Sequence, residues 1–333
     1  MSIAIGSRAR TETEVFSAFV ATLGRGPGRS RALTRAEARK AMAMVLAGQA
    51  DPHQVGAFLM LLRYRGEDPH EIAGLVEAAR AAAGVPATEF AADLDWPSYG
   101  AGRTRAAPWF LLAALALARG GVRVLMHGSN SFSGGIAVEQ ALPALGLAPA
   151  TSVDEACRLL DASGFAYLPL RCLLPRLDDL LELRRLFGLR SPVNTVARLL
   201  DPAQARAGVD GVFHPPYIAV HLGVAERLAR PRLLVVKGAG GEAERTPGKP
   251  GTAYLWDGTR CQELSLPGEY LAPADQSVET LDTFAAVWRG EAAPARPLAT
   301  ILATLGLALL ALGRPDAEAD GIWRERALAP AAP

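Results

Sequence analysis

Apolar residues recur at helical spacing through the first quarter of the chain. Val55, Phe58, Leu59 and Leu62 follow the i, i+3, i+4, i+7 pattern of an amphipathic helix. Two similar stretches stand before and after it. Each of the three follows a residue typical of a helix N-cap, namely Thr34, Asp51 and Asp68. The pattern predicts three short helices joined by tight turns, and therefore a small helical domain over residues 8–85.

The hydrophobic period changes after residue 86. Short apolar runs at 122–126 and 233–237 predict buried strands, and the second follows a predicted helix at 216–229. Residues 253–256 and 261–266 predict two strands around an Asp-Gly turn. Helices are expected at 275–289, 297–312 and 317–328. The alternation of helix and strand predicts an α/β domain with a mainly parallel central sheet, over 86–174 and 201–330, with helices near 175–200 completing the helical domain.

Composition is that of an ordinary globular protein. The chain has 333 residues, of which 50% are hydrophobic and 21% charged, and its net charge of +1 by itself predicts no polyanionic partner. Charge is nevertheless uneven, because basic residues are in excess over 1–40 and acidic residues over 242–333. Three cysteines without CxxC spacing and an N-terminus without an apolar signal region predict a reduced, cytoplasmic protein. The apolar runs at 108–118 and 298–312 predict buried helices rather than membrane spans.

A candidate ligand site lies in residues 95–135, which predict a strand, a glycine loop, a helix, a second strand and a second glycine loop. Gly100 and Gly102 either let backbone N–H groups approach a phosphate or serve a plain strand-to-helix turn. Arg103 and Arg105 beside them either contact phosphate or lie in a solvated loop. We therefore include all four in the candidate site.

His127 and Gly128 follow the predicted strand at 122–126. His127 is either an acid–base or ligand-binding group or a hydrogen-bonded structural histidine. The aromatic residues nearby either stack on nucleic-acid bases or belong to the core. Of these, we expect Trp109 in the core and Tyr99 at the surface.

Arginines are densest between 171 and 198. Arg184 shares its predicted helix with acidic residues that can pair with it, whereas no such pairing is predicted for Arg190 and Arg198. All three are candidates for anion binding, since arginine suits phosphate contacts. Lys237 and Lys249 flank a glycine-rich loop after a predicted strand, where α/β proteins bind ligands. They complete the candidate set.

Four blocks of the sequence resemble the anthranilate phosphoribosyltransferase and nucleoside phosphorylase superfamily. They are LTRAEARKAMAMVLAGQADPHQVGAFLMLLRYRGEDPHEIAGLVEA, VLMHGSNSFSGGIAVEQALPALG, LRRLFGLRSPVNTVARLLDP and LLVVKGAGGEAE, in the family's order. The resemblance implies a homodimer of subunits with a small α domain, a larger α/β domain and a cleft between them. It also implies magnesium and phosphoribosyl pyrophosphate as ligands of the active enzymes.

The chain departs from the family's motifs at the phosphate and metal positions. The family's Gly-Thr-Gly-Gly-Asp loop is replaced by residues 97–103, PSYGAGR. Its Asn-x-Ser-Thr is replaced by residues that include Pro108, Phe110 and Leu111, and its Asp-Glu pair by Ala243 and Glu244. None of the first three side chains offers a metal ligand. Arg184 falls where the family places the arginine that receives an aromatic carboxylate.

These departures resemble the YbiB group, a branch that keeps the fold and dimer and is associated with single-stranded DNA and RNA. The resemblance implies a non-catalytic, sequence-nonspecific nucleic-acid-binding protein without a cofactor. The alternative is an active glycosyl or phosphoribosyl transferase on an unidentified acceptor, with magnesium and phosphoribosyl pyrophosphate.

Overall fold

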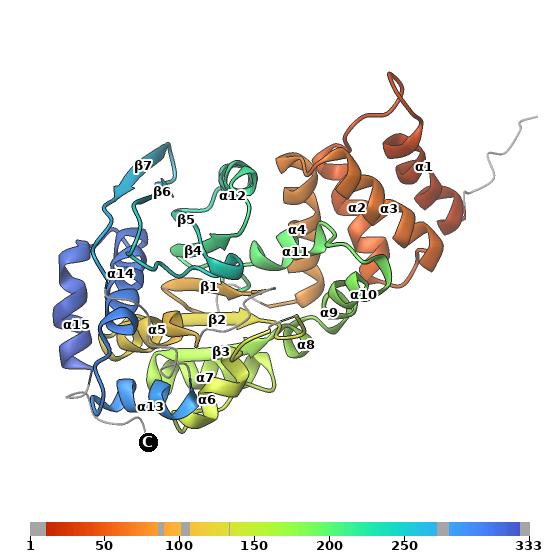
Figure 1. The fold of residues 1–333 in the computed structure, drawn as a ribbon. Coiled ribbons are helices and arrows are strands. Elements are labelled where there is room, and N and C mark those ends of the chain that lie inside the picture. The colour runs from red at the N-terminus through yellow and green to blue at the C-terminus, as the bar shows by residue number, and fades with distance from the viewer. Residues whose placement is uncertain (1–10, 86–89, 101–106, 133, 272–279, 327–333) are drawn as a thin grey trace, which may run out of the picture.

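The computed structural model describes residues 11–85, 90–100, 107–132, 134–271 and 280–326. Its N-terminal part is a bundle of four helices, drawn at the red end of the colour range in Figure 1. The helices are α1 (Glu12–Gly24), α2 (Arg35–Leu46), α3 (Pro52–Arg65) and α4 (Pro69–Ala83).

Capping residues define where these helices begin. Thr34 accepts a hydrogen bond from Glu37 N, and Glu37 accepts one from Thr34 N at 2.8 Å, which is the predicted capping box. The Asp51 and Asp68 caps are also confirmed. The prediction of three helices was wrong by one, because Thr11 and Glu14 form a second capping box that begins α1.

A seven-stranded sheet forms the centre of the larger domain, in the order β3-β2-β1-β4-β5-β6-β7. The first five strands of this order are parallel, and β6 and β7 extend the sheet as an antiparallel hairpin. The mainly parallel sheet is therefore confirmed. The strands are β1 (Leu94–Ser98), β2 (Val124–Gly128), β3 (Phe165–Pro169), β4 (Ala207–Val212), β5 (Leu233–Lys237), β6 (Gly251–Trp256) and β7 (Cys261–Leu266).

Helices cover both faces of the sheet (Figure 1). Alternate residues of β5 show the division, since Leu234 packs in one hydrophobic cluster with α5 and α14, while Leu233 and Val235 pack in another with α7, α12 and the helical domain. The helices of this domain are α5 (Trp109–Arg119), α6 (Val138–Ala144), α7 (Val153–Ser163), α8 (Leu170–Leu173), α12 (Pro216–Arg227), α13 (Leu281–Arg289), α14 (Ala295–Ala311) and α15 (Ala319–Glu325), with 3-10 turns η1 (Ala239–Gly241) and η3 (Asp316–Glu318).

Three short helices connect the two parts of the molecule: α9 (Pro175–Glu182), α10 (Arg184–Phe187) and α11 (Val193–Arg198). Helix α11 packs against α4. Arg80 of α4 also donates to the carbonyl oxygen of Leu200, just after α11, at 2.7 Å. This segment places its arginines beside the carboxyl ends of the parallel strands. Among the described residues, none of the helices has the length and apolar character needed to span a bilayer.

Close packing of α2 on α4 requires glycine at position 74. A Cβ there would lie 2.2 Å from the carbonyl oxygen of Arg35. We expect Gly74→Ala to lower the free energy of unfolding by about 1–3 kcal/mol, because the two backbones must separate. The matched control is Gly56→Ala in α3, where the nearest atom is Phe187 Cε1 at 3.7 Å and alanine should stabilise the helix by about 0.5–1 kcal/mol. Urea unfolding followed by circular dichroism measures both, and equal midpoints would contradict the packing argument.

Candidate anion-binding site

The carboxyl ends of β1, β2, β4 and β5 lie next to one another, as they must in a parallel sheet. Ser98 pairs in register with Gly128, and Val212 with Lys237. A Cβ on Gly128 would lie 2.1 Å from the carbonyl oxygen of Ser98. Gly128 is therefore explained by the close approach of two strand ends, which needs no bound phosphate.

His127 has a structural position rather than the ligand-facing one proposed from the sequence. Its side chain is fully buried. Its Nδ1 lies 2.7 Å from the Tyr99 hydroxyl, and its Nε2 lies 3.2 Å from Asp95 Oδ1. Tyr99 is buried too, and burial raises the pKa of its hydroxyl well above the ordinary value. The expected exposure of Tyr99 was therefore wrong, while Trp109 lies in the core as predicted.

A pocket of about 180 Å³ opens between the helical and α/β domains, beside these strand ends. Arg184, Arg190 and Arg198, predicted from the sequence, line it together. Sequence reasoning missed Arg63 of α3, which also lines it and donates a hydrogen bond to the Tyr217 hydroxyl. One acidic residue, Glu67, also lines it, and the remaining polar lining comes from Ser191, Asn194, Thr195, His214, Tyr217 and His221. The structure therefore gathers four arginines from two segments of the chain, and we call this the arginine pocket.

The guanidinium groups that line the arginine pocket repel one another. Burial lowers the pKa of Arg190, and the neighbouring Arg198, Arg184 and Arg63 lower it further. Arg198 is only 8% exposed, and its guanidinium donates to the carbonyl oxygens of Tyr99, at 2.8 Å, and Gly211, at 3.3 Å. Because like charges close together are costly, a bound anion would stabilise this arrangement.

The other predicted site residues do not line the arginine pocket or lie outside the described part of the chain. Gly102, Arg103 and Arg105 lie outside the described residues. Lys237, at the end of β5, and Lys249 are exposed, and neither lines the arginine pocket. Gly100 is buried against Glu242, whose Oε1 would lie 2.2 Å from a Cβ at that position. The structure therefore does not bring the two lysines into the arginine pocket, whereas Gly100 lines a small cavity of about 20 Å³ with Arg184, Arg190 and Arg198.

The donor and metal positions of the resembled enzymes do not fit their ligands here. Phe110, Leu111 and Ala243 are buried apolar side chains, and Glu244 accepts a hydrogen bond from Phe110 N at 3.0 Å. The adjoining pocket, lined by Ser98, Gly100 and Glu242 among others, has about 10 Å³, barely the space that one water molecule needs. In the described part of the chain no three acidic, histidine or cysteine side chains are grouped to hold a metal ion.

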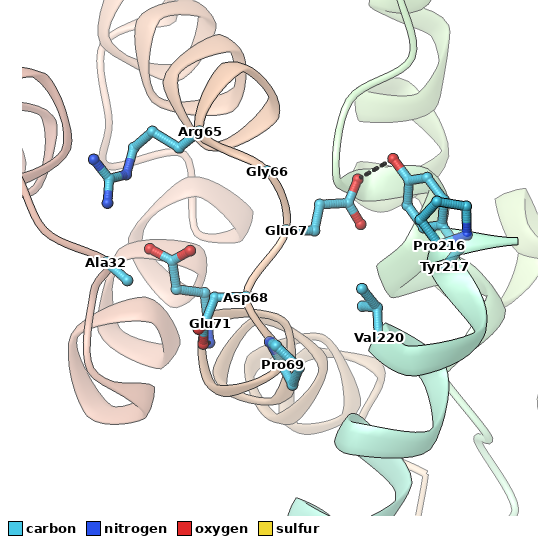
Figure 2. Close-up of a pocket in the computed structure, with 10 residues that line it drawn as sticks. All are labelled: Ala32, Arg65, Gly66, Glu67, Asp68, Pro69, Glu71, Pro216, Tyr217 and Val220. Carbon is cyan, nitrogen blue, oxygen red and sulfur yellow. Dashed lines mark hydrogen bonds between the residues drawn. The ribbon is translucent and has the colours of Figure 1, made fainter. Parts of the chain in front are cut away.

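A larger pocket, of about 540 Å³, lies on the other side of Tyr217 (Figure 2). Its charged lining is mostly acidic, because it has three acidic residues, Glu67, Asp68 and Glu71, and one basic residue, Arg65. Glu67 accepts a hydrogen bond from the Tyr217 hydroxyl at 3.0 Å, the contact dashed in Figure 2. This pocket is unsuited to an anion, so the arginine pocket is the candidate anion site.

Comparison with known proteins identifies the family. Residues 18–83 match the helical bundle domain of the glycosyl transferase family, and residues 110–328 match its a/b domain. The chain therefore belongs to this glycosyl transferase family.

Curated relatives are anthranilate phosphoribosyltransferases. The chain is 31% identical over 294 residues to that of Moorella thermoacetica, covering 85% of this chain and 86% of the relative. It is 28% identical over 300 residues to that of Exiguobacterium sibiricum, covering 86% and 87%. The chain is thus homologous to anthranilate phosphoribosyltransferase, as the sequence blocks indicated. The nucleic-acid-binding branch stays a prediction.

Solved structures agree with this fold. The crystal structure of anthranilate phosphoribosyltransferase from Thermus thermophilus matches with a TM-score of 0.74 and 25% identity, covering 95% of this chain and 94% of that one. The Saccharomyces cerevisiae enzyme in complex with PRPP and Mg matches with a TM-score of 0.70 at 17% identity, covering 94% and 93%, and shows the fold alone. The two-part architecture predicted from the sequence is therefore confirmed.

Burial of Glu71 makes stability depend on pH. Desolvation raises the pKa of this carboxyl from about 4.5 to about 7, although it accepts a hydrogen bond from Leu33 N at 2.6 Å. The folded protein therefore binds the proton more tightly than the unfolded chain, and stability should fall as pH rises from about 4.5 to 7. We expect Glu71→Gln to remove this decline, since its amide oxygen can accept the same hydrogen bond without charge.

Unfolding midpoints between pH 4.5 and 8 test this expectation. The control is Glu226→Gln, an exposed acid on α12, which should keep the wild-type pH dependence. A Glu71→Gln profile parallel to the wild type would show that Glu71 does not cause the decline.

Proposed function

We propose that this protein binds an anionic ligand in the arginine pocket between its two domains. The observation that carries the proposal is the environment of Arg190, a half-buried guanidinium whose surroundings include Arg63, Arg184 and Arg198. Guanidinium groups bind phosphate and carboxylate through paired hydrogen bonds. Binding an anion would relieve the repulsion among these arginines.

The aromatic residues at the pocket support single-stranded nucleic acid as the ligand. The Arg184 and Arg185 guanidiniums lie 4.6 and 5.7 Å from the centre of the Phe132 ring. Phe213, at the carboxyl end of β4, is 48% exposed and packs edge-on against His214. Cationic grooves with accessible aromatic rings are the usual device for binding single strands. A homodimer would align two such pockets and increase the apparent affinity.

Phosphoribosyl transfer is the second candidate, and its support comes from the relatives. Proteins similar over about 85% of this chain are named anthranilate phosphoribosyltransferases. In that case Arg184 and its neighbours would hold the carboxylate of an acceptor. The described residues offer this reaction an acceptor pocket but no fitting donor or magnesium position. The relatives therefore favour transfer, whereas the site geometry favours anion binding without it.

Removal of pocket arginines tests the binding proposal. We expect a labelled single-stranded oligonucleotide to bind at low salt, with fluorescence anisotropy as the readout, and Arg190→Ala to weaken it. Each lost phosphate contact should reduce the slope of log K against log salt by about 0.7. Arg324→Ala is the control, because Arg324 lies in α15, and Figure 1 shows α15 at the opposite end of the molecule from α3 and α10. No binding at low salt, or equal losses in both variants, would sink the nucleic-acid proposal.

Calorimetry with phosphoribosyl pyrophosphate and magnesium tests the second candidate. We expect no magnesium-dependent binding. Saturable binding that requires magnesium, together with product formation from an aromatic acid, would establish transfer instead.

A further inference from the structure

Two carboxylates from the segment after β5 lie at the carboxyl edge of the sheet. Glu242 is 3% exposed and Glu244 is 6% exposed. The first lies against the end of β1 and the second at the start of α5. Buried acids at the place where α/β proteins bind anions need a physical explanation.

Glu244 supplies the negative charge at the N-terminus of α5. This helix has Pro108 at its N-cap, no side-chain capping hydrogen bond and no acidic residue in its first turn. Trp109 N and Leu111 N donate to the carbonyl oxygens of Ala107 and Pro108, both at 2.9 Å, while Phe110 N and the helix dipole favour an anion from elsewhere. The Glu244 carboxylate provides it by accepting from Phe110 N at 3.0 Å. At the N-terminus of α5 a carboxyl side chain on the same chain thus takes the place of an external anion.

Glu242 is packed against three glycines. A Cβ would lie 2.2 Å from Glu242 Oε1 if placed on Gly100, and 2.0 and 1.7 Å from its carbonyl group if placed on Gly211 and Gly238. These glycines belong to the ends of β1, β4 and β5, so three strands leave room for this one residue. A side chain at Gly211 or Gly238 would collide with the backbone of Glu242, whereas one at Gly100 would displace only the end of the Glu242 side chain.

We propose that Glu242 and Glu244 act as internal anions that exclude phosphate ligands, including the diphosphate of a phosphoribosyl donor, from the N-terminus of α5. One helix terminus cannot serve two anions, and a carboxylate on the same chain competes at a high effective concentration. A phosphate entering here would also meet the repulsion of Glu242. External anions are therefore confined to the arginine pocket, on the other side of Arg198.

Pyrophosphate binding tests the proposal in a background that lacks the arginine pocket. In the Arg184→Ala/Arg190→Ala protein, calorimetry reports binding outside that pocket. We expect negligible binding in this background and a gain of about tenfold or more in affinity when Glu244→Ala is added, since the helix terminus then lacks its anion. Glu291→Ala is the control, because Glu291 is an exposed acid that pairs with Arg289 and should change nothing.

A second variant, Glu244→Gln, keeps the proposal testable if Glu244→Ala does not fold. Glu244→Gln keeps an oxygen that can accept from Phe110 N and removes only the charge, so we expect a smaller gain. Circular dichroism establishes which variants are folded. In the Arg184→Ala/Arg190→Ala background, tight pyrophosphate binding while both acids are intact, or folded Glu244 variants without any gain, would overturn the proposal. Neither result depends on whether the arginine pocket binds nucleic acid, so the two proposals fail separately.

Discussion

A buried chain of ion pairs holds the two parts of this molecule in position. Arg80 of α4 lies 3.3 Å from Asp201, which lies 3.3 Å from Arg230, and Arg230 lies 3.1 Å from Asp95 on β1. Asp95 also contacts His127. Although burial opposes ionisation, His127 and Arg230 hold the pKa of Asp95 below its ordinary value. Removing one partner from such a buried pair costs about 3–5 kcal/mol, so the chain persists only as a whole. It connects the helical domain to the strand ends that border the pockets.

Charge is distributed unevenly along the carboxyl edge of the sheet. Arg198 lies at the division, with its guanidinium on the carbonyl oxygens of Tyr99 and Gly211. On one side, arginines from α3 and the segment around α10 and α11 face a pocket that can admit a ligand. On the other side, Glu242 and Glu244 fill the space beside α5. Under the two proposals, the same fold keeps one anion site and closes another through the identity of its side chains, without movement of helices or strands.

Local patterns in the sequence predicted the elements well because caps and hydrophobic periods act over a few residues. The Thr34–Glu37 capping box and the strand at 233–237 are examples. The resemblance of four blocks supplied the fold class. Long-range contacts were less accessible. The sequence around His127 does not predict that Tyr99 and Asp95 contact its ring. Likewise, no local pattern predicts that Arg63 lines the same pocket as Arg184, which is more than a hundred residues away in the chain.

Glu242 is a second example of a residue whose contacts the local sequence does not predict. Its position beside a glycine-rich loop does not reveal which distant backbone segments lie against it. In the structure its side chain lies against Gly100, and its backbone carbonyl lies against Gly211 and Gly238. Roles that depend on several distant backbone segments follow from the three-dimensional structure, whereas roles that depend on helix caps follow from the sequence.

A crystal structure of the protein grown with a short single-stranded oligonucleotide tests the central claim most directly. The account predicts a phosphate group against the Arg184 and Arg190 guanidiniums, with Glu244 still accepting from Phe110 N. A phosphate at the N-terminus of α5, with Glu244 displaced and the arginine pocket without ligand, would contradict it.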